Sequence, residues 1–262
     1  MSVLLTKYYR LTLLTLITLC MFSCTKQTAV QESELSLQLS CEQSFLASKA
    51  TETEGSIAVD LLHYFVFAEG ESTPLISGQT SFNPSGTNNL KLRLFKDKAY
   101  VLAFWACGSS ANYSFDSGKV SFPNNPSAND PGLEAFYAKV PITGGQGSLN
   151  VSLKRAVAKV SVSLSNALSD ASSSSLSFDS AHKYFSLLDG EVSDLTALTF
   201  GSASCPDTQN VAYAYIFAPQ DQAHSCTMTL KVLGGTGTEL LTTVLNNIPV
   251  QRNIQTNITY NN

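Results

Sequence analysis

Cys24 is the residue whose surroundings in the sequence point most directly to a reaction. It follows an apolar stretch, residues 11–22, which is preceded by the basic residues Lys7 and Arg10. The stretch is shorter than the roughly 20 residues of a membrane-spanning helix, so it predicts a signal peptide. Ser23, a small residue, stands directly before the cysteine, as a lipoprotein signal peptidase requires. We therefore predict cleavage after Ser23 and attachment of diacylglycerol to the Cys24 thiol.

Two alternatives to this cleavage site remain. Cys20 also lies in the signal region, but the bulky Leu19 before it fits the peptidase poorly. The other alternative is an ordinary secretory signal with incidental cysteines. With Cys24 acylated, several acyl chains such as palmitate would hold the protein on a membrane, since each buried methylene contributes about 0.8 kcal/mol. We expect residues 1–23 to be the signal peptide and the polar residues 24–34 to be a tether.

Four further cysteines lie in the predicted mature chain, and an even number in an oxidising compartment allows two disulfides. They are Cys41, Cys107, Cys205 and Cys226. No two of them form a Cys-x-x-Cys motif, which argues against a redox site or a zinc ribbon. Cys107 and Cys226 fall in strand-like segments, where buried free thiols are equally expected. The disulfide and free-thiol alternatives both stay open.

Other residue patterns that would support catalysis do not occur in the sequence. The three histidines, His63, His182 and His224, are not spaced as His-x-His or His-Glu-x-x-His, so we expect no metal. There is no Gly-x-Ser-x-Gly motif, phosphate-binding loop or pair of carboxylates. We expect no enzymatic activity and no cofactor. The predicted mature chain has a net charge near −6 and lacks a basic run, which argues against binding to nucleic acid.

Hydrophobic periodicity predicts the elements that would position any site. Apolar residues recur at every second position in many segments, as in strands with one buried and one exposed face. The segments are 35–39, 57–67, 90–94, 100–105, 149–153, 160–164, 211–217, 228–232, 240–250 and 254–260. Glycine-rich residues 144–147 and 234–237 predict hairpin turns. Residues 122–132 and the serine-rich residues 171–177 predict loops, with a short helix near Leu168.

Eight or nine strands with few short helices predict an antiparallel β-sandwich, and we expect residues 35–262 to form a single domain. Three aromatic residues near predicted loops, Tyr113, Phe115 and Phe122, are candidates for carbohydrate contact. The alternative for each of them is packing at the rim of the core.

Several short motifs resemble those of the fimbrillin-like lipoproteins of Bacteroidetes. They are Tyr64-Phe65-Val66-Phe67, Ala103-Phe104-Trp105-Ala106, Glu134-Ala135-Phe136-Tyr137, Leu153-Lys154-Arg155-Ala156-Val157-Ala158-Lys159-Val160, Ile248-Pro249-Val250-Gln251-Arg252-Asn253 and Thr256-Asn257-Ile258. The resemblance implies a transthyretin-like, Greek-key sandwich on a lipoprotein of the outer membrane and cell surface. It also implies assembly into fimbriae, with an adhesion role. In such an assembly, an N-terminal strand is removed by a protease and a neighbouring subunit donates a replacement.

The sequence departs from this family pattern before residue 57. No arginine lies between Cys24 and Ile57, where only Lys26 and Lys49 are basic. We therefore expect a cut after a lysine, or no cut, in place of an arginine-specific cut. We also expect no second sandwich domain. Both points favour an anchor, tip or accessory subunit over a stalk subunit. The alternative function is a standalone surface lipoprotein that binds glycan or host protein through its loops.

One modification site follows from the same resemblance. Asp179-Ser180-Ala181 resembles the acidic-Ser/Thr-apolar pattern of O-glycosylation in these bacteria, so Ser180 is a candidate acceptor.

Residues 35–40 decide between a fimbrial subunit that exchanges strands and a standalone surface lipoprotein. If Leu35, Leu37 and Leu39 fill a groove that can be emptied, strand exchange is feasible. If this strand is central in its sheet, or is fixed by a disulfide through Cys41, strand exchange is not feasible.

Overall fold

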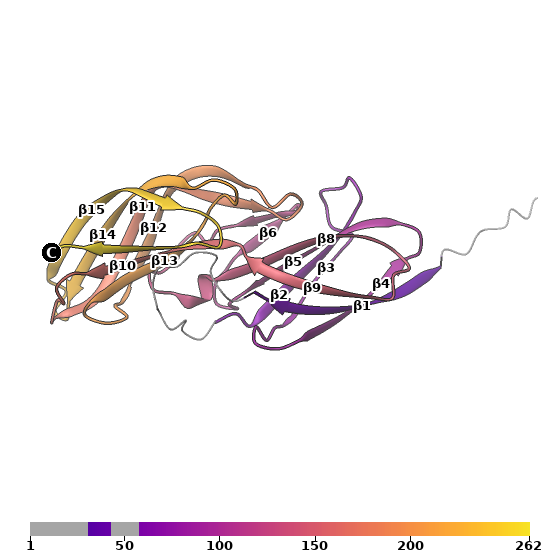
Figure 1. Ribbon diagram of the computed structural model, residues 1–262, viewed down its shortest axis with the longest axis horizontal. Coiled ribbons are helices and arrows are strands. Elements are labelled where there is room, and N and C mark those ends of the chain that lie inside the picture. The colour runs from indigo at the N-terminus through magenta and orange to yellow at the C-terminus, as the bar shows by residue number, and fades with distance from the viewer. Residues whose placement is uncertain (1–30, 43–57) are drawn as a thin grey trace, which may run out of the picture.

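The computed structural model describes residues 31–42 and 58–262, which fold almost entirely into β-strands. These ranges contain sixteen strands and one short 3-10 helix, Pro131–Leu133. The predicted all-β sandwich architecture is confirmed. The molecule is elongated, with β1 and β4 towards one end and β14 and β15 towards the other (Figure 1).

The first sandwich is built from a sheet that folds over at the corner between β8 and β9. Its strand order is β3-β2-β5-β8-β9-β1-β4. The strands are β1 (Glu32–Cys41), β2 (Leu61–Ala68), β3 (Ile76–Ser81), β4 (Asn88–Phe95), β5 (Ala99–Cys107), β8 (Ala135–Thr143) and β9 (Ser148–Arg155). Leucines of β1, β4 and β9 pack against apolar residues of β2, β5 and β8 to form one core.

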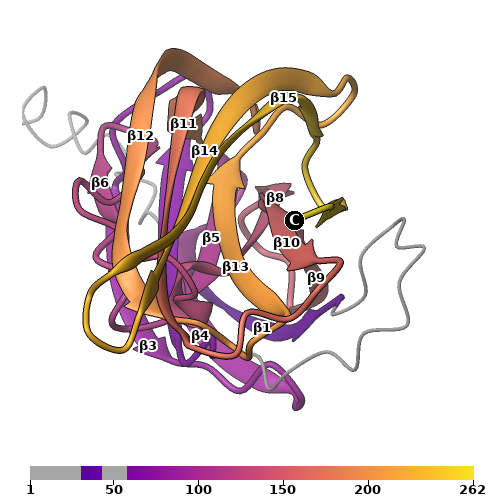
Figure 2. The ribbon, with the colours of Figure 1, turned by 90° about the vertical axis from the view of Figure 1, so that its left-hand side faces the viewer.

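The second half of the chain adds a nine-stranded sheet with its own core, which is closed on its other side by β2, β5 and β8; we call this layered unit the second sandwich. Its path runs β15-β14-β11-β13-β10-β16, and β12 and β7 pair with β11. The strands are β6 (Ser114–Asp116), β7 (Lys119–Ser121), β10 (Val157–Leu164), β11 (Ala171–Ser186), β12 (Val192–Ser204), β13 (Asn210–Phe217), β14 (His224–Gly234), β15 (Glu239–Val250) and β16 (Gln255–Tyr260). Figure 2 shows β12, β11, β14 and β15 side by side.

The β2-β5-β8 sheet contributes to both cores, because its two faces are both covered. On β5, Leu102 and Phe104 belong to the first core, whereas Ala103 and Trp105 belong to the second. A strand buried on both faces is expected to be continuously apolar, which explains the sequence of residues 100–107. That residues 35–262 form a single sandwich domain stays a prediction.

Some predicted elements differ from the observed ones. Residues 171–177 are the beginning of the long strand β11 rather than a loop, and the chain near Leu168 is not helical. Serine is accommodated there because the fully buried Ser174 hydroxyl donates a 2.6 Å hydrogen bond to the Val211 carbonyl. Two pairs are parallel, β1 with β9 and β10 with β16, within an otherwise antiparallel arrangement.

The two predicted glycine turns have different surroundings. Residues 234–237 join β14 to β15 in a hairpin whose strands pair along their length, with register shifts between Cys226 and Met228 and between Val232 and Leu233. Residues 144–147 join β8 to β9, but these strands pair only at their other end, through Phe136 with Arg155 and Tyr137 with Lys154. The strands therefore diverge towards the turn, and β9 is free to pair with β1 instead.

Candidate functional site

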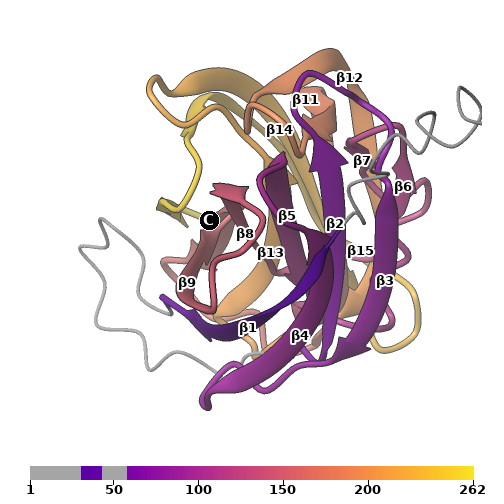
Figure 3. The ribbon, with the colours of Figure 1, turned by 90° about the vertical axis from the view of Figure 1, so that its right-hand side faces the viewer.

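Strand β1 lies second from the edge of its sheet, with only β4 outside it, so it is not an edge strand. It pairs in parallel with β9 on one side and antiparallel with β4 on the other (Figure 3). Cys41 at its end is a free thiol and does not fix the strand by a disulfide. Among the described strands, β4 pairs only with β1. Withdrawal of β1 would therefore leave a gap one strand wide, lined by unpaired backbone groups of both β4 and β9.

The three leucines predicted for the first strand fill the core beneath this gap. Leu35, Leu37 and Leu39 are exposed by only 2%, 1% and 0%. They alternate with more exposed polar residues, so one face of β1 is apolar over its length. Replacing a buried leucine by alanine typically costs about 2–5 kcal/mol, which gives β1 a large share of the packing energy of this core.

In the sequence, β1 lies between the segment predicted as a tether and strand β2. Residues 42–60 join it to β2, and β1 begins at Glu32, within the segment predicted as a tether. At its surface, Lys91 of β4 forms a 2.8 Å ion pair with Glu34. Both side chains are substantially exposed, so this pair contributes little to stability. The leucines and the backbone pairing therefore hold β1 in place.

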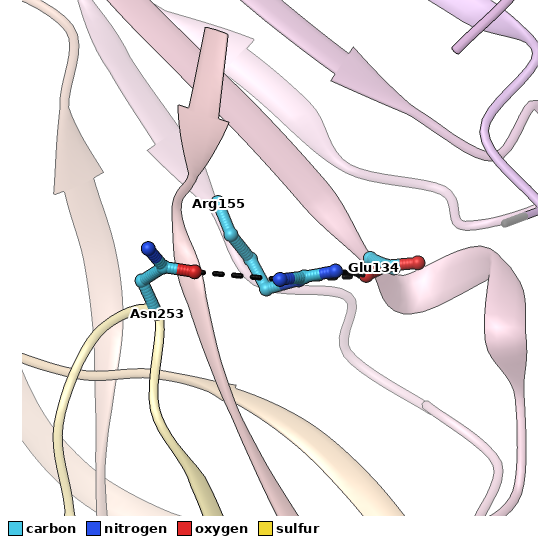
Figure 4. A network of polar contacts seen from close by, with 3 residues as sticks. All are labelled: Glu134, Arg155 and Asn253. Carbon is cyan, nitrogen blue, oxygen red and sulfur yellow. Dashed lines mark hydrogen bonds and ion pairs between the residues drawn. The ribbon is translucent and has the colours of Figure 1, made fainter. Parts of the chain in front are cut away.

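Three of the motifs that carry the family resemblance meet in one buried network (Figure 4). Arg155, at the end of β9, contacts the Glu134 carboxylate through Nε at 2.7 Å and Nη2 at 2.6 Å. Its Nη1 donates a 3.3 Å hydrogen bond to the side-chain carbonyl of Asn253, between β15 and β16. The Arg155 and Glu134 side chains are only 1% and 5% exposed. This network joins the first sandwich to the C-terminal strands.

The neighbouring Arg252 makes a second connection of the same kind. Its guanidinium lies 4.7 Å from the centre of the Phe185 ring and donates to the carbonyls of Ala218 and Gly190. The two arginines of these motifs, Arg155 and Arg252, thus hold separate elements together. The sequence motifs indicated family membership, but their spacing did not predict these pairings.

The four mature-chain cysteines are free thiols in the structure. Cys107 and Cys226 are buried, whereas Cys41 and Cys205 are half-buried. Burial raises the pKa of Cys41 and of Cys107 to about 12. Both groups therefore remain protonated at neutral pH. Formation of disulfides in an oxidising compartment stays a prediction.

Ser180 lies at an irregularity of β11, where the register with β12 shifts between Phe178 and Ala181. It is half-buried, and its hydroxyl lies 3.0 Å from Nε2 of His224. The neighbouring Asp179 is exposed and accepts a 2.8 Å hydrogen bond from the Thr227 amide, which lowers the pKa of its carboxyl. O-glycosylation of Ser180 stays a prediction.

The three aromatic candidates have different environments. Phe122 is 4% exposed, and the Tyr113 hydroxyl donates a 2.6 Å hydrogen bond to the Leu133 carbonyl, so both are packing residues. Phe115, on β6, lines a surface pocket of about 430 Å³. The alternative of rim packing holds for Tyr113 and Phe122, while Phe115 remains available for contact with a ligand.

Cys24 and the signal region lie outside the described residues. Within residues 31–42 and 58–262, no helix has the length and apolar character needed to cross a bilayer. In the same ranges, no three His, Cys, Asp or Glu side chains are grouped so that they could hold a metal ion.

A model of a family of unknown function (DUF6562) matches residues 26–261. The chain belongs to the DUF6562 family. No curated protein sequence matches it. The DUF6562 match covers both sandwiches and the buried network that joins them, so family membership applies to the whole described fold.

The solved structures similar to this DUF6562 chain include three from Bacteroides. One is a candidate polysaccharide-binding protein (DUF1812) from Bacteroides thetaiotaomicron, with a TM-score of 0.51 and 13% identity over 82% of this chain and 80% of that chain. Two others, from Bacteroides ovatus, are a candidate cell adhesion protein and a candidate adhesin. Both have a TM-score of 0.50 and cover 88% of this chain and 93% of theirs, at 12% and 8% identity. At these identities the likeness establishes the shared fold.

Proposed function

We propose that this protein is a lipid-anchored component of a fimbria-like assembly on the cell surface, where it joins a neighbour by strand exchange at the β1 position. The observation that carries the proposal is the placement of β1 between β4 and β9, with Leu35, Leu37 and Leu39 in the core. A donated strand with apolar residues at every second position would restore both the backbone pairing and the packing.

Other observations support the same proposal. The fold is shared with a candidate cell adhesion protein and a candidate adhesin. The family motifs resemble those of fimbrillin-like lipoproteins, and Cys24 follows a lipoprotein-type signal. We propose Cys24 as the lipidation site that holds the protein on the outer membrane. Loss of incorporated radioactive palmitate in a Cys24→Ala variant tests this point.

The role within the assembly follows from the basic residues around β1. Lys26 precedes β1 and Lys49 follows it, and no arginine lies between residues 24 and 57. A cut after either lysine would release the body from the lipidated Cys24. A cut after Lys49 would also detach β1, whereas a cut after Lys26 would leave β1 attached to β2. Without an arginine for the cut, we favour an anchor, tip or accessory subunit over a stalk subunit.

An immunoblot of unheated outer-membrane extract from the native host tests the proposal. Strand-exchanged assemblies resist detergent until they are boiled, so we expect bands of high mass that collapse on boiling to a band smaller than the lipidated precursor. Loss of these bands in Lys49→Gln but not in Lys26→Gln, its matched control, would identify the cut that frees β1. Bands that persist in both variants would indicate an anchor that keeps Cys24 and exchanges β1 without a cut. A single band of full mature mass before and after boiling would contradict strand exchange.

The second candidate function is that of a standalone surface lipoprotein that binds glycan or host protein through its loops. Two observations favour it: Phe115 lines a surface pocket, and the fold is shared with a candidate polysaccharide-binding protein. In this case, the immunoblot would give the single full-mass band, and binding of a ligand would not depend on the β1 position.

A further inference from the structure

A pocket of about 430 Å³ lies where the two sandwiches meet at the surface. One wall is formed by β2 and β3 of the first sandwich. The other is the hairpin formed by β6 and β7, which reaches over from β11 of the second sandwich (Figure 3). Pockets of about 300–1,000 Å³ at the junction of two structural units are typical of small-molecule sites.

The inner wall of the pocket is aromatic. The Phe115 ring of the hairpin lies 4.3 Å from the His63 ring and 5.3 Å from the Phe65 ring, measured between ring centres. His63 and Phe65 are two residues apart on β2, so their side chains share one face of the sheet. Burial lowers the pKa of His63, so the imidazole is neutral at neutral pH. The wall is therefore uncharged and consists of three aromatic rings that are tilted to one another.

The rim of the pocket carries polar side chains of several kinds. Gln79 of β3 is directly opposite His63 in the register, and Ser77 is opposite Phe65. The hairpin adds Asp116 and Lys119, which bring one charge of each sign. Among the described residues, neither the side-chain amide of Gln79 nor the His63 ring forms a hydrogen bond within the protein. Hydrogen-bond donors and acceptors thus lie beside the aromatic wall, and the two opposite charges leave no net charge that would select an ion.

The hairpin that carries Phe115 is held in position before any ligand binds. Ser117 and Gly118 both have positive φ, 45° and 73°, the conformation of a type I′ turn. The Gly118 carbonyl accepts a 2.8 Å hydrogen bond from the Leu187 amide. A side chain at Gly118 would meet the Ser72 carbonyl at 3.1 Å, so glycine permits this close approach. A preformed pocket avoids much of the ordering cost of binding.

We propose that this pocket, formed by His63, Phe65 and Phe115 with Gln79, Ser77 and Asp116 at its rim, binds one or two sugar rings of a neutral saccharide. The apolar face of a pyranose packs on an aromatic wall, and its hydroxyl groups pair with amide, hydroxyl and carboxylate groups around it. The balanced charges of Asp116 and Lys119 disfavour phosphate and acidic sugars. The pocket is too small to receive a folded protein partner.

This site is independent of the proposed assembly function. None of its residues belongs to β1, β4 or β9, so strand exchange can fail while saccharide binding holds, and the reverse. The β6–β7 hairpin and β3 both lie far from β1 in the sequence. Substitutions on the pocket rim leave the three leucines of β1 unchanged.

The test uses the full mature protein, purified in a detergent without a sugar head group. Ligand-observed NMR and calorimetry would measure binding of maltotriose, cellotriose, mannotriose, galactotriose and xylotriose, with inorganic phosphate and sialyllactose as charged probes. Ser77→Trp fills the pocket from an exposed position, and Phe115→Ala removes part of its wall. The controls are Phe95→Ala, on the exposed side of β4, and Gln209→Ala as the match for Gln79→Ala.

We expect at least one neutral trisaccharide to bind with a Kd of about 1 mM or tighter. Ser77→Trp, Phe115→Ala and Gln79→Ala should each weaken it at least roughly tenfold, while Phe95→Ala and Gln209→Ala should not change it. If Phe115→Ala lowers the Tm, its weaker binding can also result from loss of structure, and Ser77→Trp is then the variant that tests the pocket. Absence of binding at about 10 mM of every neutral probe, binding that survives Ser77→Trp, or binding of the charged probes alone would overturn the proposal.

Discussion

Strands β1 and β16 occupy related positions in the two halves of the molecule, but their surroundings differ. Each runs parallel to one of two consecutive strands, β1 to β9 and β16 to β10. Strand β1 has a neighbour on both sides and three leucines in the core. Strand β16 lies at the end of its sheet path, and its apolar residues Ile258 and Tyr260 are half-buried.

The difference shows why the two strands would respond differently to removal. Loss of β16 would expose the outer side of β10, which is an ordinary sheet edge. Loss of β1 would open a groove inside a sandwich and separate β4 from β9. Only the β1 position therefore offers both unpaired backbone and an apolar groove to an incoming strand.

The largest effect is expected at the network that joins the two halves. Arg155→Ala should lower the free energy of unfolding by about 3–5 kcal/mol, because it leaves the buried Glu134 carboxylate without its partner. Urea unfolding followed by Trp105 fluorescence measures this loss. Glu239→Ala, which breaks the exposed ion pair with Lys231, should cost at most about 1 kcal/mol. Equal losses in the two variants would show that the network does not connect the halves.

The next largest effect on the free energy of unfolding is expected in β1, the buried member of the β1 and β16 comparison. Leu37→Ala should lower the free energy of unfolding by about 2–5 kcal/mol, because Leu37 is 1% exposed and leaves a cavity. The same urea experiment measures it.

Ile258→Ala on β16 should cost less, about 1–2 kcal/mol, because this side chain is half-buried and its site is open to solvent. A loss as large as that of Leu37→Ala would remove the distinction between the two strands.

The smallest effect is a dependence of stability on pH. Burial, and then the charge of His224, lowers the pKa of His182 in the folded protein below its usual 6.5, and burial lowers that of His63. The unfolded chain therefore binds protons first as the pH falls through 6.5, and stability should decrease below that pH. Urea midpoints at pH 7.5 and 5.5 measure the decrease. His182→Gln and His63→Gln should each reduce it, and a midpoint that rises at pH 5.5 would contradict the sign.

Much of the first sandwich could be predicted from sequence because its strands alternate strongly. Leu35, Leu37 and Leu39 predicted β1 and its buried face, and the alternation of leucines with Lys91 and Arg93 predicted β4. Strand β12 was missed, because most of its residues are exposed and no apolar period marks it. Strand β11 was also missed, and its N-terminal part was predicted to be a loop, because serine in a buried strand needs hydrogen-bonding partners that lie far away in the sequence.

The candidate sites were less predictable than the strands. Glu134, Arg155 and Asn253 stood in motifs, but their pairing depends on how three distant segments meet. Phe115, Tyr113 and Phe122 could not be ranked from sequence, since only the packing of the β6–β7 hairpin leaves Phe115 at a pocket. Its signal, the Ser117-Gly118 turn between two short strands, is recognisable in retrospect.

Exchange of β1 in the purified protein tests the central claim most directly. A specific protease site placed between β1 and β2 would be cut, and the protein mixed in moderate urea with a fluorescent peptide of residues 32–40. We expect the peptide to replace β1 and to remain bound in SDS until heating, whereas a peptide with Leu37→Asp should not bind. If the cut protein excludes the first peptide, or takes up both peptides equally, the β1 position is not a site of strand exchange.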